Sequence, residues 1–137
     1  MDVQLINKEL LSELHQRAKE SERLRQNFDL RTTAEDTSQR MLNALEPGTR
    51  VPVHRHQDTN ETVVMLRGSI RELFFDEAGQ ITEEILLRAN AEPSAMNIPA
   101  GAWHTLECLE PGTILLEMKD GPFVPRQPED ERPQWNP

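Results

Sequence analysis

The chain has 137 residues, a length that suits one domain and is too short for two. Its formal net charge is -9 and its Lys and Arg residues form no basic stripe, which excludes a nucleic-acid backbone as the expected partner. No apolar run is long enough to cross a bilayer, so no membrane partner is expected, and the single cysteine, Cys108, excludes an intrachain disulfide. With no secretory signal visible at the N-terminus, the sequence predicts a soluble protein of the reducing cytoplasm.

The first predicted element is an amphipathic helix over about residues 4–25, with Asn7 or Ser12 as its N-cap. Its apolar residues recur at helical spacing: Ile6, Leu10, Leu14 and Ala18. His15 lies on the polar side of this helix and is expected at the surface. Residues 25–36 show no hydrophobic periodicity and are expected to form a connecting arm.

Residues 39–120 are predicted to form a β-barrel, because short apolar runs alternate with turns rich in Gly, Pro, Asp and Asn. The runs cover residues 40–46, 51–56, 61–68, 69–76, 81–88, 94–99, 104–110 and 113–120. About eight short strands after one helix is the count of a jelly roll. Residues 1–38 hold the helix and arm that precede this barrel, and residues 121–137 are expected to form an extended strap with Phe123 and Trp135 as anchors.

Three histidines and one glutamate are candidate metal ligands. Side chains two residues apart in a strand lie on the same face, so His54 and His56 are expected to point to one side. If residues 57–60 form a hairpin loop, Glu61 begins the next antiparallel strand beside His56, and His104 begins a later strand. Three imidazoles and a carboxylate suit one divalent ion of Fe, Mn, Ni, Co or Zn, with open positions for water or substrate.

The spacing of these residues resembles the two sequence motifs of the cupin superfamily. From Gly48 to Gly68 the chain reads Gly, five residues, His, one residue, His, four residues, Glu, six residues, Gly. From Pro99 to His104 it reads Pro, one residue, Gly, two residues, His, while Pro93 and Cys108 stand in place of the Gly and Asn of the second motif. The resemblance implies a cupin double-stranded β-helix, a jelly-roll barrel, with the metal inside its mouth.

The chain also resembles the WbuC family of cupin-fold metalloproteins, over nearly its whole length from about residue 27. The resemblance rests on RMLNALEPGTRVPVHRHQDTNETVVMLRGSIRELFFDEAG, IPAGAWHTLECLEPGT and EMKDGPFVP, followed by Trp135. Members of that family occur among bacterial O-antigen polysaccharide genes, which implies a sugar or sugar-nucleotide type of substrate without naming a reaction. Asn27 and Phe28 resemble a family segment that fits either a lid over the barrel or simple packing. Cupin barrels often pair, so a homodimer is expected by analogy.

Further residues are candidates for the pocket of such a barrel. In a strand that begins at Glu61, Met65 and Arg67 point to the same face of the sheet as that glutamate. Arg67 either meets an anionic substrate or turns to solvent at the strand end. Cys108 shares parity with the late histidine and either lines the pocket or acts as a small buried hydrophobe. Glu117 and Lys119 alternate with the apolar residues of the last run and are expected to face outward.

Two classes of function fit these features. The first is a metal-dependent enzyme that acts on a small sugar-derived molecule, by isomerisation or epimerisation with Glu61 as a candidate base, or as a dioxygenase if the ion is Fe(II). The second is a non-catalytic sugar-binding or regulatory module in which the metal is structural or helps to hold the ligand. A second titratable group in the pocket would discriminate between them, and the sequence identifies none.

Overall fold

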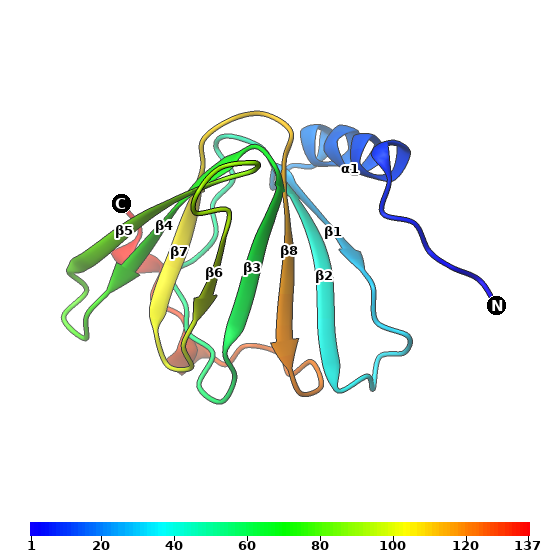
Figure 1. Ribbon diagram of the computed structural model, residues 1–137. Coiled ribbons are helices and arrows are strands. Elements are labelled where there is room, and N and C mark those ends of the chain that lie inside the picture. Colours follow the sequence, from blue (N-terminus) through cyan, green and yellow to red (C-terminus); the bar gives the residue numbers. More distant parts are fainter.

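The structure is a computed structural model that describes residues 1–137 (Figure 1). One helix, α1 (Lys8–Glu20), precedes eight strands in two sheets, and no helix is both long and apolar enough to cross a membrane. The strands are β1 (Arg25–Asp29), β2 (Ser38–Leu45), β3 (Glu61–Arg67), β4 (Ser69–Phe75), β5 (Ile81–Arg88), β6 (Ala95–Ile98), β7 (Trp103–Cys108) and β8 (Thr113–Asp120). Two short 3-10 helices follow: η1 (Pro128–Asp130) and η2 (Pro133–Trp135). A mainly β fold preceded by an N-terminal helix is therefore confirmed.

The strands pair only in antiparallel fashion, in a five-stranded sheet of order β1-β2-β8-β3-β6 and a three-stranded sheet of order β5-β4-β7. The chain passes from one sheet to the other between β3 and β4 through a single residue, Gly68, whose φ is 74°. A Cβ at Gly68 would lie 2.8 Å from Cα of Thr113. The second glycine of the first histidine motif is thus required by backbone conformation and by close packing.

Helix α1 covers the outer face of the five-stranded sheet. One buried cluster joins the helix to β2 and β8: Leu11, Leu14, Ala18, Leu42, Ala44 and Ile114. Asn7, one of the two predicted N-cap candidates, caps the helix, and its side chain accepts a hydrogen bond from the backbone N–H of Leu10 at 3.0 Å. The prediction that His15 is a plain surface residue is wrong, because its Nε2 lies 2.8 Å from Oε1 of the buried Glu46. This contact joins the helix to the barrel.

Three predicted segments differ from the structure. The helix, expected over about residues 4–25, spans only Lys8–Glu20. Residues 51–56 form no regular strand, and His54 alone makes isolated bridges there. Pro52 has no N–H to donate to a ladder, which accounts for the irregular backbone. The predicted arm instead contributes the edge strand β1. Hydrophobic alternation does not reveal this strand, because Arg25 and Asn27, on one face, are polar residues that line a cavity.

The C-terminal strap, residues 121–137, fastens the irregular segment that carries His54. Asp130 Oδ1 accepts hydrogen bonds from Arg55 Nε at 2.9 Å and from Gln57 Nε2 at 2.6 Å. The backbone carbonyl of Asp130 also accepts a hydrogen bond from the N–H of Arg55 at 3.0 Å. The strap therefore supplies the hydrogen bonds that a neighbouring strand would otherwise provide.

Trp135 anchors the strap by aromatic packing. Its ring lies 6.2 Å from that of Phe75 and 5.3 Å from that of Trp103, centroid to centroid. The other predicted anchor, Phe123, is 57% exposed and is not buried in the core. One of the two aromatic residues thus holds the strap to the barrel, and the other lies at the surface.

Candidate metal centre

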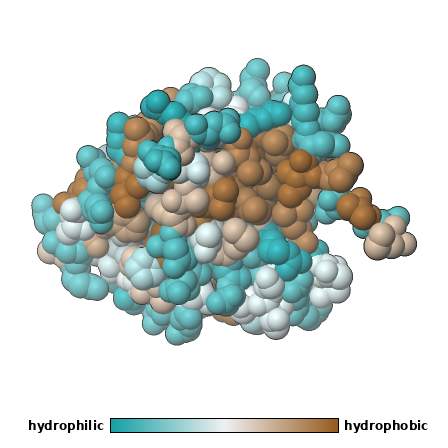
Figure 2. All heavy atoms as spheres, in the orientation of Figure 1, coloured by the Kyte–Doolittle hydropathy of each residue, from teal (hydrophilic) through white to brown (hydrophobic).

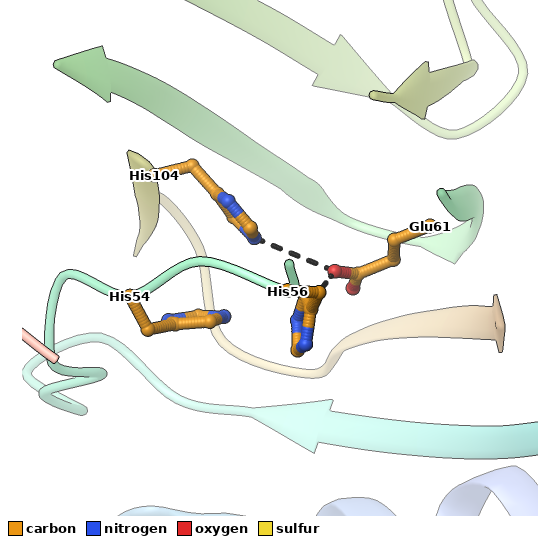
Figure 3. A group of neighbouring side chains, drawn as sticks. All are labelled: His54, His56, Glu61 and His104. Carbon is orange, nitrogen blue, oxygen red and sulfur yellow. Dashed lines mark ion pairs between the residues drawn. The ribbon is translucent and has the colours of Figure 1, made fainter. Parts of the chain in front are cut away.

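Four potential ligands converge in one place (Figure 3). One donor atom from each of His54, His56, Glu61 and His104 lies within 4.8 Å of the others. Metal–ligand bonds of about 2.0–2.2 Å place adjacent ligands of one ion about 3 Å apart and opposite ligands about 4.2 Å apart. Glu61 Oε2 lies 3.2 Å from His56 Nε2 and 3.4 Å from His104 Nε2. The cluster has the dimensions of a site that could hold one metal ion.

Separate parts of the fold position these four residues. Glu61 is the first residue of β3 and pairs in register with Lys119 of β8, and His104 is the second residue of β7. His54 exchanges both backbone hydrogen bonds with His104, at 3.0 and 2.9 Å. His56 follows in the same segment, so its side chain reaches the same side although the segment is not a regular strand.

Backbone carbonyl groups fix the tautomers of two of the imidazoles. His54 Nδ1 lies 2.8 Å from the carbonyl oxygen of Pro52, and His104 Nδ1 lies 2.9 Å from that of Ala102. A carbonyl oxygen only accepts, so Nδ1 carries the proton in both rings and Nε2 keeps its lone pair. Hydrogen bonds of this kind orient histidine ligands of protein-bound metals.

The charge states at the cluster also suit a divalent cation. Burial would raise the pKa of Glu61, but contacts with His104 and His56 together lower that pKa well below its ordinary value. Burial lowers the pKa of His54 well below its ordinary value, and the charges of His104 and Arg126 act in the same direction. A carboxylate and neutral imidazole are the forms that bind metal. His56 Nε2, Glu61 Oε2 and His104 Nε2 are buried and make no hydrogen bond of good geometry, so a cation would satisfy them.

A cavity of about 350 Å³ adjoins the cluster and is lined by all four residues. Two further carboxyl groups line it, Glu72 of β4 and Glu117 of β8. Glu72 is 2% exposed and its Oε2 has no hydrogen-bond partner, while Asn43 Nδ2 donates to Glu117 Oε1 at 3.2 Å. Burial raises the pKa of Glu72 well above its ordinary value, and the charges of Glu61 and Glu117 add to this effect. Burial raises the pKa of Glu117 as well.

The prediction that Glu117 and Lys119 face outward is wrong, because both side chains line the cavity. The apolar residues that alternate with them, Ile114 and Leu116, face α1 on the other side of the sheet. Alternation alone does not say which face is the barrel interior when a helix covers the opposite face. Glu72 was missed for a related reason: its only signal was a carboxylate within an apolar run.

Sequence comparison identifies a family for this chain. A family model described as a domain of unknown function, DUF6016, matches residues 6–87, which is more than half of the 137 residues. The chain belongs to the DUF6016 family. No curated protein matches its sequence. The resemblance to the WbuC family stays a prediction.

The fold of this DUF6016 protein is that of the cupins, and three solved structures illustrate it. CapF, in complex with the inhibitor 3-isopropenyl-tropolone, is 22% identical over 72% of this chain and 28% of CapF, with a TM-score of 0.60. The oxalate decarboxylase of Bacillus subtilis, an enzyme with Mn(II) centres, is 20% identical over 77% of this chain and 26% of the enzyme, with a TM-score of 0.56. KdgF from Halomonas sp. is 14% identical over 90% of both chains, with a TM-score of 0.58.

These similarities confirm the jelly-roll barrel and show the fold alone. The DUF6016 chain spans about a quarter of the length of CapF and of oxalate decarboxylase, and 90% of the length of KdgF. The activities of the longer proteins therefore do not transfer to it.

The remaining candidate pocket residues of the DUF6016 protein lie in different places. Met65 and Cys108 belong to a buried apolar cluster and do not line the cavity, which matches the alternative of Cys108 as a small buried hydrophobe. Arg67 lies beyond an irregularity at the end of β3, also outside the cavity lining. Of the two arm residues, Asn27 lines the cavity and Phe28 packs beneath α1.

Proposed function

We propose that this protein binds one divalent metal ion and acts on a small polar, sugar-derived substrate in bacterial surface-polysaccharide metabolism. The observation that carries the proposal is the convergence of three imidazoles and a carboxylate at the wall of a cavity of about 350 Å³. That volume lies within the range of about 300–1,000 Å³ that small-molecule sites occupy. The resemblance to the WbuC family supports the sugar and polysaccharide context.

His54, His56, Glu61 and His104 would hold the ion, which we propose to be Fe, Mn, Ni, Co or Zn. When bound, such an ion supplies Lewis acidity toward a carbonyl or hydroxyl oxygen. The Mn(II) centres of oxalate decarboxylase support testing manganese first.

Glu72 and Glu117 favour an enzyme over a binding module. An isomerase or epimerase needs a group that gives or takes a proton, and both carboxyl groups face the cavity beside the cluster. Burial raises the pKa of Glu72, which favours its protonated form and thus a role as proton donor to a substrate. Glu61, the candidate base from the sequence, contacts two of the histidines and is better placed as a ligand.

Proton exchange and oxygen consumption test this proposal. Metal-loaded protein would be incubated with a panel of sugars and sugar nucleotides in D2O, and exchange of carbon-bound hydrogen followed by NMR, with an oxygen electrode in parallel. Exchange that is lost in Glu72→Gln and kept in Glu107→Gln, an exposed carboxylate paired with Arg71, would support isomerase or epimerase chemistry. Oxygen uptake would support a dioxygenase, and ligand binding without either signal would favour the non-catalytic module.

We also propose that the protein is a homodimer. Apolar side chains precede α1 and are exposed, including Val3 at 70%, Leu5 at 66% and Ile6 at 43%. Figure 2 shows apolar residues gathered on the side where the N-terminal segment extends from the molecule. A second copy of the chain would cover them. Light scattering after size exclusion would give the mass of a dimer for the full chain and of a monomer for Leu5→Ser if this segment forms the contact. The cytoplasmic location stays a prediction.

A further inference from the structure

The cavity has a charge composition opposite to that of the chain as a whole. The sequence contains 15 Lys and Arg residues against 24 Asp and Glu residues. Only three carboxylates line the cavity, namely Glu61, Glu72 and Glu117. Six cationic residues line it: Arg23, Arg25, Arg31, Arg40, Lys119 and Arg126. An acidic protein that gathers its cations around one cavity favours an anionic ligand there.

Two of these cations already have partners. Arg31 Nη2 lies 2.7 Å from Asp29 Oδ2, and Arg40 Nη2 lies 3.0 Å from Asp36 Oδ2. Neighbouring carboxylates thus satisfy both groups without a ligand.

Three other arginines, Arg23, Arg25 and Arg126, lack this compensation and are called here the arginine trio. Arg25 is half-buried, and its guanidinium donates at 2.7 Å to a backbone carbonyl and forms no ion pair. The side chain of Arg23 makes no hydrogen bond or ion pair within the protein. Arg126 Nε lies 3.7 Å from Glu131 Oε1, a long contact between side chains that are each about one-third exposed. Such a contact contributes little to stability.

The trio is a group of like charges that line the same cavity as the metal cluster. Burial lowers the pKa of the Arg25 guanidinium, and the charges of Arg23 and Arg126 lower it further. An anion between the guanidinium groups would relieve this repulsion, and the planar donors of arginine suit the oxygens of a carboxylate or phosphate.

We propose that the arginine trio binds the carboxylate or phosphate group of the small molecule that this cavity accepts. The inference rests on the proposed function in one respect. The other end of the same bound small molecule is taken to face the cluster of His54, His56, Glu61 and His104. Arg23 lies between α1 and β1, Arg25 is the first residue of the edge strand β1, and Arg126 lies in the strap. The barrel thus provides the metal ligands, and its first strand, the residues just before that strand and the strap select the charge of the substrate.

Calorimetric titration with three matched probes tests the inference: glucose 6-phosphate, glucuronate and uncharged glucose, each added to Mn-loaded protein. We expect at least one anionic probe to bind at least tenfold more tightly than glucose, and to weaken as KCl is raised. Arg25→Gln and Arg23→Gln should each reduce that affinity about tenfold. Arg23→Gln removes no hydrogen bond within the protein, so it preserves the fold. Arg71→Gln, on the exposed side of the three-stranded sheet, is the control and should bind like the wild type.

The three probes and the metal content separate the outcomes. Preference for glucose 6-phosphate identifies a phosphate, and preference for glucuronate identifies a carboxylate. Anions that bind no more tightly than glucose, or bind equally to the trio variants, would overturn the inference while leaving metal binding intact. If protein prepared without added Mn retains no metal in elemental analysis and still binds the anions through the trio, the proposed function fails and the anion site stands.

Discussion

The metal cluster has two halves that are built in different ways. Glu61 and His104 lie in regular strands, where ladder hydrogen bonds to β8 and β4 fix the backbone. His54 and His56 lie in an irregular segment whose backbone is held by a bridge to His104, by a hydrogen bond from the N–H of Gly101 to the carbonyl of His56, and by the strap. The first half is a property of the barrel, whereas the second depends on a segment more than seventy residues away in the sequence.

This difference shows that a barrel can position ligands without a complete ladder. Two guanidinium groups lie over the aromatic ring of Trp103, that of Arg55 at 4.6 Å and that of Arg132 at 4.7 Å from its centroid. Asn136 of the strap accepts a hydrogen bond from the N–H of Val53 at 3.0 Å. The irregular half should therefore respond to changes in the strap, and the regular half should not.

The largest effect is expected when a ligand of the regular half is removed. Wild-type protein should show a higher Tm when Mn or Zn is added, because a ligand that binds the folded state stabilises it. In His104→Ala the metal should raise Tm little or not at all. Cys108→Ala is the control, since Cys108 lies outside the cavity lining, and it should keep the full metal-induced shift. An equal shift in His104→Ala would contradict the assignment.

A smaller effect is expected when the support of the irregular half is removed. Asp130→Ala deletes the carboxylate that accepts hydrogen bonds from Arg55 and Gln57. Metal affinity should fall about tenfold, the lower end of the effect of losing residues that orient metal ligands. Glu129→Ala, an exposed neighbour in η1, should bind metal like the wild type. Unchanged affinity in Asp130→Ala, measured by competition with a chelator, would show that the strap does not position the histidines.

A third prediction concerns Glu72, which lies in a regular strand beside the cluster. Its pKa is raised in the folded protein from an ordinary value of 4.5. Above pH 4.5 the unfolded chain releases this proton while the folded protein keeps it, so the free energy of unfolding falls as pH rises toward the raised pKa.

Glu72→Gln cannot ionise and should remove this loss. In metal-free protein the variant should be more stable than wild type at pH 8, with little difference at pH 4. Urea unfolding at both pH values measures this, and Glu84→Gln on the exposed β5 should show no such dependence. A variant less stable than wild type at pH 8 would show that Glu72 is ionised and stabilising.

The smallest effect is expected far from both halves of the cluster. Asn7→Ala removes the N-cap of α1 and should reduce the free energy of unfolding by about 1 kcal/mol. Asn7→Asp, which can accept the same hydrogen bond, should restore it. Metal affinity should be unchanged in both variants, and a parallel loss of metal would show that helix packing and the cluster are linked.

The sequence predicted the parts of this molecule that depend on local spacing. The N-cap at Asn7, most of the barrel strands and the convergence of His54, His56, Glu61 and His104 follow from period, turn residues and motif spacing.

Features that depend on tertiary packing were not predictable in the same way. The inward direction of Glu117 is set by α1, which covers the opposite face of β8, and nothing within β8 reports this. Strand β1 is not recognisable from hydrophobic alternation, because the residues on its inner face are polar and line the cavity. The role of Asp130 depends on where the strap crosses the barrel, which is a long-range contact.

Elemental analysis of the purified protein tests the central claim most directly. Protein would be prepared without chelator or affinity-resin metal, beside His54→Ala prepared in the same way. Binding of one ion by the cluster predicts about one equivalent of Fe, Mn, Ni, Co or Zn in the wild type and its loss in the variant. Wild-type protein without metal, or a variant that retains the full equivalent, would contradict the claim.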